Sequence, residues 1–126
     1  MRTLAQAEAR WAARGFEDYA IEMRRVCFCP PAVTQWERVE VRAGHVDRVI
    51  VLETGADVLP VELVYFHTVE QAFNSIRQAN HEDWLEDVVA EYDRVLGFPI
   101  RVDFIPQRGI LDAGSLLYSR NASLLP

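Results

Sequence analysis

The chain contains no lysine, and its 13 basic residues are all arginines scattered along the sequence. Two interpretations of this bias stay open: bidentate binding of anions, and a codon bias of the genome. An excess of positive charge is also missing, because acidic residues outnumber the arginines and give a formal net charge of −6. Since an acidic domain does not attract a phosphate backbone, the composition argues against nucleic acid as a partner.

Long hydrophobic runs are absent as well. The most apolar stretch, residues 58–66, is far shorter than the roughly 20 residues of a membrane-spanning helix, and it contains Pro60 and Glu62. The chain reaches an amphipathic segment within a few residues of Met1, which argues against a signal peptide. This leaves two settings open, the cytosol and a mature region whose leader has been removed. There is no repeat or low-complexity tract, so we predict one domain over residues 1–126.

Hydrophobic periodicity predicts an α+β fold. Helical patterns cover residues 3–14 and 68–79, and each begins with a threonine followed three residues later by glutamine, the pattern of a capping box. Alternating patterns predict strands over residues 19–29, 36–43, 45–52, 84–92 and 100–105. The order α-β-β-β-α-β-β indicates a mainly antiparallel sheet of about five strands with both helices packed on one face.

The remaining segments carry weaker patterns. Residues 53–67 are expected to form a long connection, partly extended over residues 61–65, and residues after Pro106 a loop or short irregular element. In the first strand, unbroken alternation would place Arg25 on the same face as Tyr19. Because a charge on an apolar face is costly, we expect a β-bulge near Arg24 and Arg25. The apolar side of the second helix is expected to pack on the sheet through Phe73.

Both cysteines, Cys27 and Cys29, lie at the end of the first predicted strand, before Pro30 and Pro31. Along an extended strand their Cα atoms would be about 6.5 Å apart, near the upper limit for a disulfide, so a bridge needs a local kink. A static bridge or inert thiols, a redox-active dithiol and part of a metal site all stay open. We favour the structural pair and predict no metal, because there is no second cysteine pair and the three histidines are isolated.

No catalytic set is recognisable, so we do not predict an enzyme and expect no cofactor. Asp93 and Asp103 could be considered an acid–base pair, but an aspartate at a strand end more often caps a turn. We therefore interpret Tyr92, Asp93, Gly97 and Pro99 as a structural turn between the last two strands.

One apolar surface is predicted beside the cysteines. Phe28, Pro30, Pro31 and Trp36 would together form a patch suited to a protein partner, provided that Trp36 is exposed at the start of its strand. This patch is the predicted binding surface of the chain.

The order of these landmarks resembles a known family. It comprises a tryptophan in the opening helix, a tyrosine before a strand that ends in Cys-x-Cys, a valine-rich hairpin, a Thr-Val-Glu helix start and a Tyr-Asp-x-x-x-Gly-x-Pro motif: Trp11, Tyr19, Cys27, Cys29, Gly44, Thr68, Phe73, Tyr92, Asp93, Gly97, Pro99 and Asp103. This is similar to an uncharacterised family (a domain of unknown function) of small bacterial secreted proteins and lipoproteins. The chain departs from the family pattern at Arg94, where a proline is common, and in the tail after Pro106.

The resemblance spans about residues 11–103 and implies an extracytoplasmic setting in the cell envelope, but no activity. Our leading hypothesis is a non-enzymatic cell-envelope module that binds another envelope protein or supports an envelope structure. The alternative hypothesis is a dithiol redox or metal-handling protein that uses Cys27 and Cys29.

Overall fold

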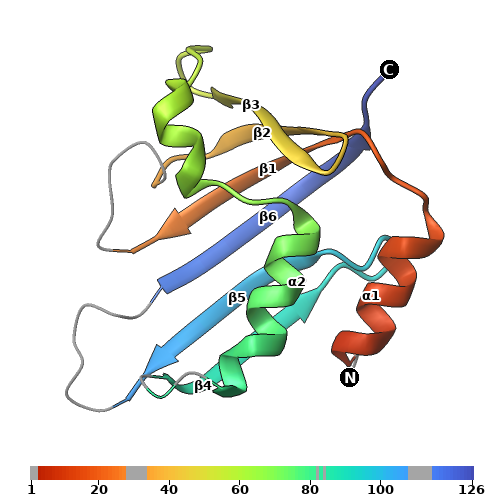
Figure 1. The fold of residues 1–126 in the computed structure, drawn as a ribbon, viewed down its shortest axis with the longest axis vertical. Helices are drawn as coiled ribbons and strands as arrows, with labels where there is room; N and C mark the ends of the chain where they lie inside the picture. The colour runs from red at the N-terminus through yellow and green to blue at the C-terminus, as the bar shows by residue number, and fades with distance from the viewer. Residues whose placement is uncertain (1–2, 28–33, 82, 84, 108–114) are drawn as a thin grey trace.

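The computed structural model describes residues 3–27, 34–81, 83, 85–107 and 115–126. Within them the chain forms two α-helices, two short 3-10 helices (η) and six strands (Figure 1). In chain order these are α1 (Leu4–Ala13), β1 (Tyr19–Val26), β2 (Glu37–Arg42), β3 (His45–Val51), η2 (Pro60–Tyr65), α2 (Val69–Gln78), η3 (Ala79–His81), β4 (Leu85–Tyr92), β5 (Pro99–Pro106) and β6 (Ser115–Leu124).

The six strands form one sheet in the order β3-β2-β1-β6-β5-β4, in which every neighbouring pair is antiparallel. The sheet consists of two three-stranded meanders that meet where β1 pairs with β6 (Figure 1). The α+β class is confirmed, but the expected count of about five strands is wrong, because the segment after Pro106 supplies a sixth. The pairing of β6 with strands on both sides explains why local sequence did not indicate it.

Both α-helices begin as the sequence predicts. Thr3 and Thr68 each accept a hydrogen bond from the backbone N–H three residues on, and the glutamine at that position accepts one in return. These capping boxes satisfy backbone donors that a helix start leaves unpaired. Figure 1 shows α1 and α2 on the same face of the sheet.

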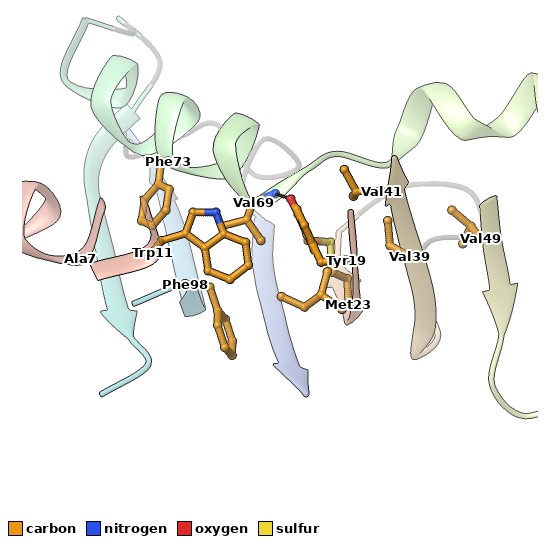
Figure 2. Close-up of a cluster of buried hydrophobic side chains, with 11 residues drawn as sticks. Ala7, Trp11, Tyr19, Met23, Val39, Val41, Val49, Val69, Phe73 and Phe98 are labelled. Carbon is orange, nitrogen blue, oxygen red and sulfur yellow. Dashed lines mark hydrogen bonds between the residues drawn. The ribbon is translucent and has the colours of Figure 1, made fainter. Parts of the chain in front are cut away.

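The core lies between these helices and the sheet (Figure 2). Phe73 of α2 stacks on Tyr92 of β4 with the ring centroids 6.2 Å apart, and Trp11 of α1 makes an edge contact with Phe98. Val69, Ile21 and Val41 belong to the same buried cluster, while Ile76 and Val102 belong to a second one beside it. The apolar side of α2 therefore packs on the sheet as its periodicity predicts.

Two local expectations are wrong. Residues 61–65 are not extended, because Pro60–Tyr65 form a 3-10 helix that starts on the fixed φ of Pro60. The β1–β6 register shifts between Ala20 and Glu22, where the extra residue is in β6, because Ala20 pairs with Ser123 and Glu22 with Arg120. Pairing is regular from Glu22 to Val26. Arg25 therefore stays in register, opposite the buried Leu117, on the face that the helices cover.

Candidate functional site

A cavity of about 240 Å³ lies between α2 and the end of the sheet. Its lining comes from seven parts of the chain: β1, the residue before Thr68, α2, η3, β4, β5 and β6. The polar members of this lining are Arg25, His67, Ser75, Gln78 and Ser115. We call this space the Arg25–His67 cavity.

Arg25 is the only cation in the described lining of the cavity. Its Nη2 atom lies 3.2 Å from Nδ1 of His67. Within the part of the chain that the structure describes, this is its one side-chain hydrogen bond, and no carboxylate forms an ion pair with it. Burial lowers the pKa of Arg25, yet a guanidinium starts so high that it keeps its charge. A positive charge is therefore held away from bulk water without a counter-charge from the described residues.

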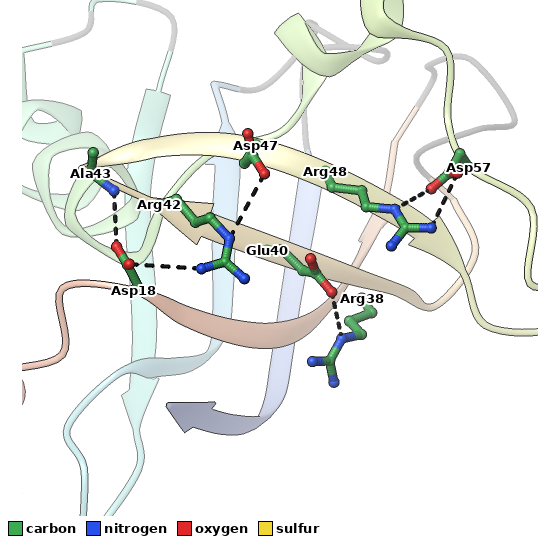
Figure 3. A network of polar contacts seen from close by, with 8 residues as sticks. All are labelled: Asp18, Arg38, Glu40, Arg42, Ala43, Asp47, Arg48 and Asp57. Carbon is green, nitrogen blue, oxygen red and sulfur yellow. Dashed lines mark hydrogen bonds and ion pairs between the residues drawn. The ribbon is translucent and has the colours of Figure 1, made fainter. Parts of the chain in front are cut away.

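Other arginines of the sheet form ion pairs with carboxylates. Figure 3 shows the paired ones on β2 and β3, where Arg38 reaches Glu40 and Arg48 reaches Asp57 at 2.6 Å. Arg42 lies between Asp18 and Asp47 at 3.8 and 3.9 Å. The contrast shows that the cavity arginine differs from its neighbours in both burial and pairing.

His67 adds a second buried polar group. Its Nε2 atom is inaccessible to solvent and has no hydrogen-bond partner among the described residues. Burial, with the charge of Arg25 as a smaller cause, lowers the pKa of His67 to about 3, so the imidazole is neutral near pH 7. Because a guanidinium can only donate, Nδ1 must accept, and the proton of the neutral ring must then lie on Nε2.

The site thus presents two kinds of donor that lack an acceptor. Arg25 has further N–H groups beyond the one used on His67, and His67 has the Nε2–H. A buried donor without a partner costs about 1–3 kcal/mol, and more for a charged group. An oxygen acceptor in the cavity, above all an anionic one, would relieve the cost at Arg25.

The rest of the lining is mainly apolar. Ala72, Ala79, Leu85, Phe104 and Leu117 complete it. A second hollow, of about 10 Å³, shares Arg25, His67 and Leu117 with the cavity, but it has room for about one water molecule at most. Of these two adjoining spaces, the larger one has room for a ligand.

The predicted cysteine pair lies close in sequence to this cavity. Cys27 is half-buried, one residue after the end of β1 and two residues after Arg25. Cys29, Phe28, Pro30 and Pro31 lie outside the described residues, so their predicted roles stay predictions. Among the described residues there is no cluster of three or more acidic, histidine or cysteine side chains that could hold a metal ion.

Trp36 takes part in a contact that the sequence did not predict. Its side chain is half-buried, and the guanidinium of Arg120 lies 3.8 Å from its ring centroid. Arg120 also donates to Glu22 at 2.7 Å. Arg120 follows the buried Ser119 and so points to the face opposite the helices. Trp36 and the Arg25–His67 cavity therefore belong to different sides of the sheet.

The four residues of the predicted structural turn lie around the connection between β4 and β5. Oδ2 of Asp93 accepts hydrogen bonds from the backbone N–H of Leu96 at 2.7 Å and of Val95 at 3.0 Å. Gly97 has φ +90°, and a Cβ there would lie 2.4 Å from the carbonyl oxygen of Ala7. Tyr92 stacks on Phe73, and Pro99 is fully buried as the first residue of β5. This turn fits under α1 and does not line the cavity.

Sequence reasoning noticed Arg25 but not the site. The alternation of β1 correctly places Arg25 with Tyr19, and that was the available signal. His67, Ser75 and Ser115 carry no local pattern that connects them, because they meet only in the folded sheet.

The fold defines a small α+β domain, with an antiparallel sheet covered by helices on one face. Residues 3–123 match the family of unknown function (DUF6174), and the chain belongs to that family. Comparisons with curated proteins and with solved structures found no match. No helix in the described part of the chain is both long and apolar enough to cross a membrane.

Proposed function

We propose that this protein is a non-enzymatic binding module of the cell envelope, and that the Arg25–His67 cavity takes the anionic group of its ligand. The observation that supports this most directly is Arg25, a partly buried guanidinium that has no carboxylate partner among the described residues, beside a space of about 240 Å³. A buried group that raises the free energy of the fold without a partner is typical of a ligand site.

A binding role agrees better with this geometry than a catalytic one. Arg25 stays charged and His67 stays neutral across the physiological range, so neither is suited to exchange a proton with a substrate. The remaining polar groups of the lining, Ser75, Gln78 and Ser115, are neutral hydrogen-bonding groups. Together they favour holding an anion over transforming it.

The envelope setting is supported by the resemblance of the Cys-x-Cys strand and the turn motif to secreted proteins and lipoproteins. The protein partner rests on the apolar patch that the sequence predicts at Phe28, Pro30, Pro31 and Trp36. Fractionation of cells that produce the full-length gene product would test the setting. A protein found only in the cytosolic fraction would contradict this part of the proposal. Anion binding by the cavity is tested separately.

Binding is tested by thermal unfolding and calorimetry with acetate, phenylacetate, sulfate and inorganic phosphate as probes. A ligand at a hundredfold excess over its Kd stabilises the folded state by about 2.7 kcal/mol, which raises the Tm by several degrees in a domain of this size. We expect at least one probe to stabilise the wild type but not the Arg25→Gln variant.

Arg24→Gln is the matched control, because Arg24 is the exposed neighbour in β1 and donates to the backbone oxygen of Thr34. It should bind as the wild type does. If none of the four anions stabilises the wild type, or if Arg24→Gln loses as much binding as Arg25→Gln, the proposed function is wrong.

A further inference from the structure

The charge of the described cavity lining is a single positive charge. Among the described lining residues, Arg25 is the only cation, there is no aspartate or glutamate, and His67 is neutral. A ligand with one negative charge neutralises this site. A ligand with two negative charges would leave one of them uncompensated in a partly dehydrated space, which is costly.

The donors of the site also suit one class of anion. A guanidinium presents parallel N–H groups whose spacing matches the two oxygens of a carboxylate. One N–H of Arg25 is used on His67, which leaves others for a bidentate contact. This small set satisfies two oxygens more readily than the four oxygens of phosphate or sulfate.

Besides the anionic group, the lining of the cavity suits an apolar part of the ligand. Leu85, Phe104 and Leu117 come from three different strands and line the same space, with Ala72 and Ala79 opposite them on α2 and η3. An apolar cavity of about 150 Å³ holds one benzene ring, and this one measures about 240 Å³. A carboxylate plus a branched alkyl group or a single ring fits that volume.

We infer that the Arg25–His67 cavity binds a monocarboxylate that carries a short apolar body; this inference rests on the proposed function. Two sources share this chemistry: the C-terminus of a polypeptide that ends in an apolar residue, and a free organic acid. The apolar body distinguishes the ligand from acetate, and the single charge distinguishes it from phosphate.

Calorimetry with six probes tests the inference on the whole chain: N-acetyl-leucine, N-acetyl-leucinamide, N-acetyl-alanyl-leucine, phenylacetate, acetate and inorganic phosphate. We expect N-acetyl-leucine or phenylacetate to bind at least about tenfold more tightly than acetate, which lacks the body, and than the amide, which lacks the charge. Arg25→Gln should remove the preference for N-acetyl-leucine over its amide, whereas Arg24→Gln should keep it.

A second variant tests the apolar part of the cavity without changing its charge. Ser75→Leu narrows the cavity from the exposed side of α2 and leaves Arg25 in place. We expect it to weaken phenylacetate at least about tenfold while acetate changes little. Equal weakening of both probes would contradict an apolar subsite.

The probes also separate the two sources and the two proposals. Tighter binding of N-acetyl-alanyl-leucine than of phenylacetate supports a polypeptide C-terminus, and the reverse order supports a free acid. Phosphate that binds as tightly as N-acetyl-leucine overturns the carboxylate inference but leaves the anion site. If no probe binds, the inference and the proposed function are both wrong.

Discussion

Trp11 donates its indole N–H to Oε2 of Glu70 across 2.5 Å, and this contact joins α1 to the first turn of α2. Oε1 of the same carboxylate accepts from the hydroxyl of Tyr19 at 2.8 Å. The Tyr19 oxygen in turn accepts from the backbone N–H of Val69 at 2.9 Å. One surface carboxylate thus connects both helices to β1. Because Glu70 lies in the first turn of α2, its negative charge also interacts favourably with the positive end of the dipole of that helix.

Replacing Glu70 with alanine should destabilise the fold by about 1–3 kcal/mol, because two hydrogen bonds to a charged acceptor are lost and the buried Tyr19 loses the acceptor of its hydroxyl. Urea unfolding measures the change. Glu86→Ala, at an exposed position of β4, is the control and should change stability by less than about 0.5 kcal/mol. Equal effects of the two substitutions would contradict the role of Glu70.

Gly97→Ala should destabilise the fold more than Gly55→Ala. Both glycines have positive φ, +90° and +75°, so both substitutions carry a backbone penalty of about 1 kcal/mol. Only at Gly97 would the new Cβ meet the carbonyl oxygen of Ala7, at 2.4 Å, while Gly55 has open space around it. Chemical unfolding of the two variants should therefore differ by about 1 kcal/mol or more. Variants of equal stability would show that the turn does not press against α1.

Arg25→Met should stabilise the protein in the absence of ligand. The substitution replaces a partly buried charge, which has no carboxylate partner among the described residues, by an apolar side chain of similar length. Exchanging buried charges for apolar groups has stabilised proteins by about 1–4 kcal/mol, and unfolding in urea would show the gain here. A loss of stability would mean that Arg25 stabilises the fold without a ligand, which would contradict the main support for the proposed anion site.

Stability should fall as the pH rises from about 4.5 to 7, because of Glu37. Its side chain is fully buried, and neither oxygen has a hydrogen-bond partner among the described residues. Burial, with the nearby Glu62 as a smaller cause, raises its pKa from 4.5 to about 7. Between these values the folded state holds a proton that the unfolded state releases, so folding is favoured at the acidic end of the range.

Other carboxylates also titrate, so the comparison is made with Glu37→Gln, which stays neutral at every pH. Relative to this variant, the wild type should lose up to about 3 kcal/mol between pH 4.5 and 7.5. Denaturant unfolding at several pH values measures the difference. Parallel pH profiles of the two proteins would show that Glu37 does not titrate in this range.

Thiol counting tests the predicted pair of Cys27 and Cys29. If the pair is structural and the protein matures outside the cytosol, native protein should react with no thiol reagent before reduction and with two equivalents afterwards. Rapid labelling of one cysteine near neutral pH, reversible by oxidation, would instead favour the redox hypothesis, since a reactive thiolate must be accessible and of low pKa.

The parts of the fold that the sequence predicts correctly depend on local signals. The capping boxes at Thr3 and Thr68 act within one turn, and the tight turn at Gly44 requires its φ of +79°. The same holds for Asp93, which accepts hydrogen bonds from residues two and three positions on. Each of these features is set by a few neighbouring residues.

The missed parts depend on distant segments. Strand β6 is stabilised by partners on both sides, and η2 forms where an extended segment was expected. The expected bulge at Arg25 rested on the cost of burying a charge, which is a sound rule for a stable core. The rule fails here because Arg25 lies beside a cavity and His67, and their meeting cannot be deduced from either position alone.

The central position of β6 determines when the molecule can finish folding. Since β6 lies between β1 and β5, a growing chain that has not yet produced it holds two half-sheets, each with an open edge strand. β1 pairs with β6, which lies at the opposite end of the sequence. The contacts that close the sheet are therefore long-range and slow to form. Synthesis of this protein therefore passes through a stage in which completed helices and hairpins still expose edges that invite association with other chains.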